Sequence, residues 1–321
     1  MSIKIIESIQ LTYLVPSLLF MTFVGFIILY KILTKSKNFQ NEFYPLVCYR
    51  TFNDILYHIS ILFTLKLPSW SIMQSLYLEN QFIASLSYLF GATTCCVPFI
   101  HTLFISSLRY LAIYYPVKYK RISNRTTTFI LLLLLFIISF GIGLPTLFFD
   151  SKYVYNDLTK TVSPVFTTHS VAYYQIGYAI VFYSITIIIS VVCNISNFIG
   201  LWKNNKKNGR NKRSEILFAL YCLFTLFTTC LMEAYLILRI GGNFFENQVM
   251  VIIANSNLIW IGDLSTLGDF YFLIIINSEV RFAIKEFFHK LIGKEITSSI
   301  KTTEIKSTQQ SKVLRGGKVV S

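Results

Sequence analysis

The chain has 321 residues, of which 54% are hydrophobic and only 14% are charged, and its formal net charge is +14. Water-soluble domains carry about 25% charged residues, so this composition excludes an ordinary soluble domain and favours a protein that lies in the lipid bilayer. The Lys and Arg residues fall between apolar blocks rather than on one amphipathic surface. This placement favours a membrane face over nucleic acid as the partner of the positive charge.

Seven apolar blocks follow one another along the chain, and each is long enough to cross about 30 Å of hydrocarbon as a helix. In chain order, the blocks cover residues 8–30, 45–67, 81–113, 127–149, 171–202, 214–240 and 248–277. The first block is too long for the core of a secretory signal peptide, so we expect it to be retained. Pro98 and Pro145 lie inside the third and fourth blocks and should kink those helices.

The segment after the seventh block, residues 278–292, has the pattern of an amphipathic helix. Its apolar side chains recur at helical spacing between charged ones, which is typical of a helix lying on a membrane surface. Residues 293–321 are polar and rich in Ser, Thr, Gln and Lys, a composition typical of disorder. We therefore expect an all-α membrane protein with an N-terminal segment (1–10), a seven-helix transmembrane domain (11–277), this juxtamembrane helix and a disordered tail.

The distribution of basic residues among the connections predicts the orientation of the chain. The first, third and fifth connections and the tail are rich in Lys and Arg. The N-terminus and the other connections hold only one or two each, with Lys66 counted in the second connection and Arg239 in the sixth. Because positive charge accumulates on the cytoplasmic side, we expect the N-terminus outside and the C-terminus in the cytoplasm.

Cysteine and histidine usage indicates neither a disulfide framework nor a metal site. All six cysteines lie inside apolar blocks, and the four histidines are scattered without the spacing of metal ligands. A membrane enzyme would need clustered His or Cys, a nucleophile elbow or paired acids with a base, and the sequence has none of these. We therefore expect no catalytic activity, no cofactor and no metal.

The end of the third block carries the most specific pattern in the chain. Arg109 lies about one helical turn before the end of the third block, and the next charged residue is Lys118 in the basic connection. A guanidinium in hydrocarbon is costly, which marks a functional residue by default, although an arginine that snorkels to anchor the helix end is the alternative.

The surrounding residues, namely Arg109-Tyr110, Ala112-Ile113, Pro116 and Tyr119, resemble the rhodopsin-like receptor signature Asp-Arg-Tyr-x-Ala-Ile-x-x-Pro-x-x-Tyr at the inner end of helix 3. In that family the arginine reaches the G protein when helix 6 swings out, and the proline places the second cytoplasmic loop. The resemblance implies a coupling surface formed by Arg109, Tyr110, Ile113, Pro116 and Tyr119.

The departures from this signature indicate which group of seven-helix receptors the chain resembles. Leu108 replaces the acidic residue, so the inactive state must be held in some other way. Helix 6 lacks proline, helix 7 lacks Asn-Pro-x-x-Tyr, and the usual outer disulfide is missing. Together with Tyr13-x-x-Pro16-Ser17, Asp54 in helix 2 and Ser278-x-x-Arg281, this pattern is similar to the nematode serpentine chemoreceptors, in particular the class G superfamily and its class V-like members.

This resemblance implies a chemosensory receptor in the plasma membrane of sensory neurons, in their cilia, coupled to a heterotrimeric G protein. It names neither the small-molecule ligand nor the oligomeric state, so a dimer stays open. The main alternative is a membrane transporter or channel, which would show internal repeats and several midplane charges. The sequence has no internal repeat, and its intramembrane charges follow no inverted symmetry.

Candidates for the ligand pocket lie in the outer halves of the third, fifth, sixth and seventh helices: Tyr88, Gly91, Tyr174, Tyr178, Glu233 and Asn257. A place in the interfacial aromatic belt also explains each tyrosine. Gly91 stands where amine receptors place their aspartate, which disfavours a biogenic amine as the ligand. Helix 7 has no lysine, which excludes retinal bound as a Schiff base.

Intramembrane acids predict an internal polar site, to which we assign Asp54, Asp263 and Asp269. Asp54 lies one helical turn from Arg50, a spacing that suits an ion pair. Glu233 and Asp263 are candidates for a ligand cation or for an internal proton or ion site, and ordinary hydrogen bonding between helices is the alternative for both.

Overall fold

The computed structural model describes residues 5–156, 161–168, 170–208 and 213–291. The expected disordered tail (293–321) lies outside these residues, as do Arg210 and Lys212 of the basic fifth connection.

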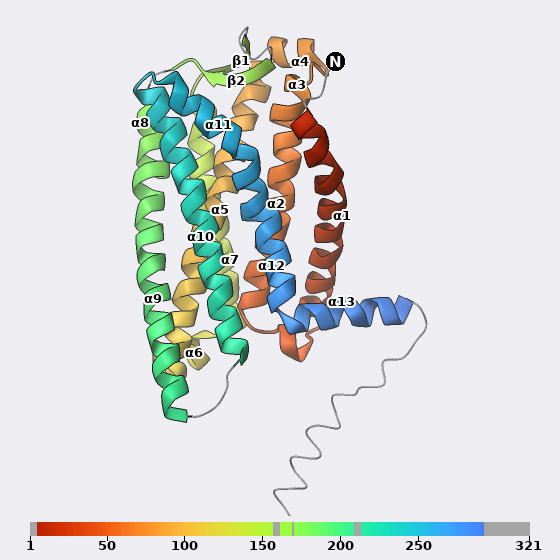
Figure 1. Ribbon diagram of the computed structural model, residues 1–321, viewed down its shortest axis with the longest axis vertical. Helices are drawn as coiled ribbons and strands as arrows, with labels where there is room; N and C mark the ends of the chain where they lie inside the picture. Colours follow the sequence, from red (N-terminus) through yellow and green to blue (C-terminus); the bar gives the residue numbers. More distant parts are fainter. Residues whose placement is uncertain (1–4, 157–160, 169, 209–212, 292–321) are drawn as a thin grey trace, which may run out of the picture.

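Seven long helices stand side by side in one bundle (Figure 1). Several of them change helix type along their length. The bounds in chain order are α1 (Ile5–Leu33); α2 (Phe43–Ile61) continued by η2 (Leu62–Lys66) and α3 (Leu67–Ser69); α5 (Gln81–Tyr114); α7 (Arg125–Gly143) continued by η3 (Leu144–Phe148); α8 (Val171–Gln175) continued by η4 (Ile176–Phe182) and α9 (Tyr183–Asn208); α10 (Arg213–Phe244); and α11 (Gln248–Asp263) continued by η5 (Leu264–Gly268) and α12 (Asp269–Ile276). Each long helix coincides, within a few residues, with one of the apolar blocks.

Within the described residues, six of these helices are long and apolar enough to cross a membrane. The remaining one, α2 with η2 and α3, carries the charged residues Arg50, Asp54 and Lys66. All three of these charged side chains are buried inside the bundle. This second helix therefore turns its charges away from the lipid and toward the other helices.

Short elements connect the long helices: η1 (Lys37–Phe39), α4 (Gln74–Glu79), α6 (Pro116–Ile122), the strands β1 (Ser151–Asn156) and β2 (Thr161–Phe166), and α13 (Ser278–Leu291). The strands and α4 lie at one end of the bundle, and α6 and α13 lie at the other (Figure 1). We call these the hairpin end and the α13 end. Prediction from the apolar blocks gave the helical architecture and missed the hairpin, which is short and falls in a connection.

The β1–β2 hairpin closes over the bundle. The strands pair antiparallel, with Tyr153 opposite Pro164. Tyr153 is buried, donates a hydrogen bond to the carbonyl oxygen of Thr64 at 2.8 Å, and packs its ring 5.1 Å from that of Tyr77. The hairpin is therefore attached to the second helix and to α4 by specific contacts.

The chain turns sharply between α12 and α13. The side-chain oxygen of Asn277 accepts from the backbone N–H groups of Glu279 and Val280, which caps the start of α13. Arg281 donates to the carbonyl oxygen of Ile274 at 2.8 Å and so satisfies one end of α12. The helix α13 then runs crosswise to the long helices, past the end of α1 and out beyond the bundle (Figure 1), in agreement with the amphipathic pattern.

An ion pair fastens α13 to α1. Lys31 Nζ lies 2.6 Å from Glu286 Oε2, and this hydrogen bond holds the pKa of the Glu286 carboxyl below its usual value. The rings of Phe23 and Phe287 also meet at 5.1 Å.

Helices α5 and α7 approach closely at Gly143. A Cβ at this position would lie 2.0 Å from Thr93 Oγ1 and 2.9 Å from the carbonyl oxygen of Leu89, so only glycine fits. Gly141, on another face of α7, has no neighbour within 4 Å of such a Cβ. Small residues at a contact between membrane helices allow this close approach.

Two basic residues that the sequence placed in connections lie inside helices. Lys66 is buried in η2, and Arg239 lies within α10, which continues to Phe244. Their assignment to the second and sixth connections was therefore wrong. Both residues lie near the end of an apolar block (45–67 and 214–240), and each helix continues past its block, to Ser69 and to Phe244. The bundle provides polar partners there, Gln10 for Lys66 and Tyr235 for Arg239.

Candidate functional site

At the α13 end, Arg109 links α5 to α10. Its guanidinium carbon lies 4.0 Å from the centroid of the Phe218 ring, a cation–π contact. The Phe218 ring in turn packs edge-on against Phe43 of α2 at 4.9 Å. Arg109 forms no ion pair with a carboxylate in the described part of the chain. An aromatic ring therefore holds the arginine where the rhodopsin-like signature has an acid.

The neighbouring candidate residues have different surroundings. Tyr110 packs its ring 4.8 Å from that of Tyr114. A Cβ at Gly200 of α9 would lie 2.6 Å from Ile113 Cγ2, so Ile113 lies at a close approach of α5 and α9. Pro116 is exposed in the first turn of α6, a position that suits its missing N–H group.

Tyr119 is bound to the connection that precedes α2. Its hydroxyl donates to Glu42, and Ser123 Oγ donates to the same carboxylate at 2.5 Å. Burial, together with the hydrogen bond to Glu42, raises the pKa of Tyr119 to about 12, so the phenol stays protonated and remains a donor at neutral pH. Prediction from sequence missed Glu42, although it is the one acidic residue between Lys31 and α2.

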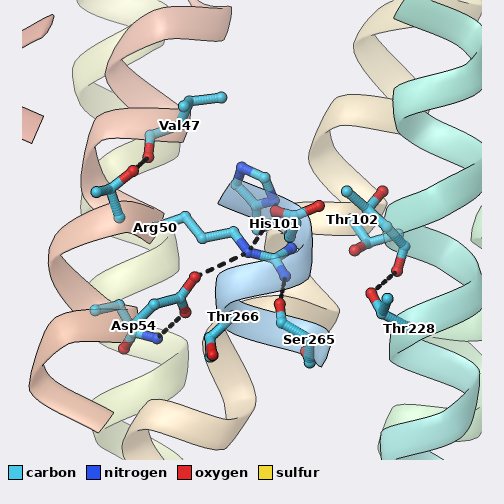
Figure 2. A network of polar contacts seen from close by, with 12 residues as sticks. Val47, Arg50, Asp54, His101, Thr102, Thr228, Ser265 and Thr266 are labelled. Carbon is cyan, nitrogen blue, oxygen red and sulfur yellow. Dashed lines mark hydrogen bonds and ion pairs between the residues drawn. The ribbon is translucent and has the colours of Figure 1, made fainter. Parts of the chain in front are cut away.

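A network of buried polar side chains joins the helices in the middle of the bundle (Figure 2). Arg50 Nε lies 3.2 Å from Asp269 Oδ2 and 3.6 Å from Asp54 Oδ2. The same guanidinium donates to the carbonyl oxygen of Ser265 at 2.9 Å and lies 3.2 Å from His101 Nδ1. One arginine of the second helix thus contacts the third and seventh helices.

This network extends to α10, because Tyr221 donates to Asp269 Oδ2 at 3.0 Å. Two carboxylates share a single guanidinium, so the group carries a net negative charge unless it binds a proton or a cation. Sequence reasoning assigned Asp54 and Asp269 to one polar site and paired Arg50 with Asp54 by spacing, but it had no signal that Asp269 is the closer partner of Arg50.

Asp263 belongs to a different group, at the hairpin end. It accepts hydrogen bonds from Gln10 Nε2, at 2.8 Å, and from the hydroxyl of Tyr13, both on α1. Gln10 also accepts from Lys66 Nζ at 2.5 Å. The structure thus brings Asp54 and Asp269 together and places Asp263 between the first, second and seventh helices.

Among the ligand-pocket candidates, Tyr88 lies directly under the hairpin. Its hydroxyl donates to the carbonyl oxygen of Pro164 at 2.8 Å, and its ring stacks on Phe166 at 3.6 Å. A Cβ at Gly91, one turn further along α5, would meet no atom within 4 Å. Open space therefore adjoins this face of α5.

Tyr174 and Tyr178 lie on the neighbouring fifth helix, with their rings 5.1 Å apart. Tyr174 donates to the carbonyl oxygen of Ile142 at 2.6 Å. Tyr88 of α5 and Tyr178 of η4 are on elements that both pack against α10, whose Arg239 was not assigned to the site by prediction from sequence. These tyrosines therefore lie on helices next to the one that carries this cation.

The remaining two candidates lie apart from this group. Glu233 is buried and accepts a hydrogen bond from Ser184 Oγ of α9 at 2.8 Å. Asn257 is on an exposed face of α11 and donates to the carbonyl oxygen of Ile253 in its own helix.

A family model described as serpentine type 7TM GPCR chemoreceptor Srv matches residues 10–289. No curated protein matches the chain. The matched residues span the seven long helices and include each of the polar and aromatic groups described above.

Proposed function

Because the chain belongs to the serpentine type 7TM GPCR chemoreceptor Srv family, we propose that it binds an external small molecule and activates a heterotrimeric G protein. The family makes the chain a multi-pass membrane protein of the chemoreceptor type. In the proposed orientation, the hairpin end faces the outside and the α13 end faces the cytoplasm. The many Lys and Arg residues of the connections at the α13 end support this orientation, and we place the receptor in the plasma membrane of sensory neurons, in their cilia.

The contact between Arg109 and Phe218 is the observation that carries the coupling proposal. It joins α5 to α10 at the end of the bundle where a G protein would bind. In the resting state the Phe218 ring covers the guanidinium. A ligand that favours the other conformation moves this end of α10 away and frees Arg109 for the C-terminus of a Gα subunit.

This arrangement also explains how the chain can have Leu108 where the signature has an acidic residue. Leu108 packs against the apolar core and offers Arg109 no charge. The π-face of Phe218 attracts the cation in its place, so the resting state has a restraint that needs no carboxylate.

Nucleotide exchange tests the proposal. Gα subunits of each class are co-expressed with the receptor in membranes, and exchange is measured with mixed volatile odorants, normalised to receptor at the cell surface. Arg109→Ala should abolish exchange. Arg125→Gln, which removes an exposed arginine at the start of α7, should leave exchange unchanged.

Two outcomes would contradict the coupling role. Normal exchange in Arg109→Ala would show that the arginine takes no part in activation. A variant that fails to reach the surface would show that Arg109 supports folding instead.

A further inference from the structure

Arg239 faces the interior of the bundle rather than the lipid. It follows Met232 by two turns and Tyr235 by one turn on α10, and both of those residues are 2% exposed. Ile237, on another face of the same helix, is 41% exposed. Arg239 therefore does not snorkel along the outside of the helix toward the lipid headgroups.

The charge of Arg239 has no carboxylate partner in the described part of the chain. Its Nη1 donates to the hydroxyl oxygen of Tyr235 at 2.9 Å, and this is its one hydrogen bond there. Glu233 lies on a different face of α10, where Ser184 of α9 binds it. An arginine within a membrane normally pairs with another group, because an uncompensated charge is costly.

Tyrosines and open space lie on the elements that pack next to this cation. The elements that carry these side chains, α5 with Tyr88 and Cys95 and η4 with Tyr178, both pack against α10. Tyr88 and Cys95 are on the same face of α5 as Gly91, where a Cβ would meet no atom within 4 Å. The hairpin covers this region through the contact of Tyr88 with Pro164.

We propose that Arg239 binds the carboxylate of a small organic acid that enters from the hairpin end. This inference rests on the proposed receptor function and names the class of its ligand. The guanidinium offers paired N–H donors that match a carboxylate. Because Tyr235 accepts from Arg239, its own O–H proton is free to donate to the same ligand, while the rings of Tyr88 and Tyr178 contact the apolar part.

Ligand binding is measured without a G protein, as the shift of the thermal unfolding midpoint of the full-length receptor in neutral phosphatidylcholine nanodiscs. A thiol-reactive dye reports unfolding, because Cys48, Cys96 and Cys222 are buried in the folded chain. The probes are the straight-chain acids from acetate to decanoate, benzoate, the methyl ester of each acid, and hexylamine. A ligand that binds only the folded state raises the midpoint.

At least one acid should raise the midpoint of the wild type, and its ester and hexylamine should not. Arg239→Gln should weaken the binding of this acid by about 10- to 100-fold, since hydrogen bonds to charged groups are lost. Arg239→Lys should retain part of the shift, and Tyr235→Phe should weaken it less. Arg125→Gln, which removes an exposed arginine of α7, should behave as the wild type.

The inference is overturned if no acid shifts the folded wild type, if esters act as well as acids, or if Arg239→Gln keeps the shift. It is also overturned if phosphatidylglycerol in the nanodisc, rather than a free acid, stabilises the receptor through Arg239, because the anion is then a lipid headgroup. Arg239-dependent acid binding without nucleotide exchange would refute G-protein coupling alone. Exchange driven by neutral odorants and indifferent to Arg239 would refute the acid ligand alone.

Discussion

Replacing Phe218 by leucine should raise the activity of the receptor in the absence of ligand. The substitution removes the aromatic face that lies 4.0 Å from the Arg109 guanidinium, and it removes the edge-on ring contact with Phe43 at 4.9 Å. A cation–π contact is worth about 0.5–2 kcal/mol, depending on its desolvation, and an aromatic pair about 0.5–1.5 kcal/mol. Leucine keeps much of the apolar contact.

Both lost contacts join α10 to its neighbours in the resting state, so the substitution destabilises that state selectively. Arg109 is half-buried, and we therefore expect a loss of about 1–2 kcal/mol, which shifts the balance between resting and active states by about 5- to 30-fold. The assay is nucleotide exchange without added ligand, divided by the amount of receptor at the surface.

Phe227→Leu provides the matched control, because it makes the same change on a side chain of α10 that is 54% exposed. It should leave basal exchange unaltered. If Phe218→Leu reaches the surface and its basal exchange equals that of the wild type, Phe218 does not restrain Arg109 and the reasoning fails.

Three further substitutions test the contacts that hold the bundle. Gly143→Ala should destabilise the receptor by about 1–3 kcal/mol through overpacking, which is measured as a lower thermal unfolding midpoint in detergent. Gly141→Ala is the control and should keep the wild-type midpoint, because no atom lies within 4 Å of the new Cβ. Equal midpoints for the two variants would refute the close contact at Gly143. Arg50→Met leaves two buried carboxylates without their cation and should lower the free energy of unfolding by about 3–5 kcal/mol. The measurements are surface expression and the thermal unfolding midpoint, both of which should fall. A midpoint equal to that of the wild type would show that the ion pairs contribute nothing to stability. Glu42→Ala removes the acceptor of Tyr119 and should speed tryptic cleavage within α6; an unchanged rate would show that α6 is held by other contacts.

The number and position of the long helices could be predicted because the signal is local. A stretch of about 20 apolar residues crosses the hydrocarbon as a helix whatever its neighbours are. The same holds for α13, whose amphipathic spacing is contained in fourteen residues, and for the stretch around Arg109, whose motif is contiguous. The two-stranded hairpin was missed because its strands pair in a connection and carry no membrane-length signal.

The partners of the charged residues could not be predicted, because they depend on how each helix is rotated about its axis. Arg50 meets Asp269 across the bundle, Arg109 meets Phe218, and Arg239 turns inward, although its position near the end of an apolar block indicated a loop. Nearly continuous apolar blocks fix the depth of a helix in the bilayer and leave this rotation open. Packing among the seven helices sets it, because side chains between helices must fill space and satisfy buried polar groups together. The sequence by itself therefore determined which segments cross the membrane and which family motif they carry. The tertiary structure decided which carboxylate, aromatic ring or ligand each buried cation can contact.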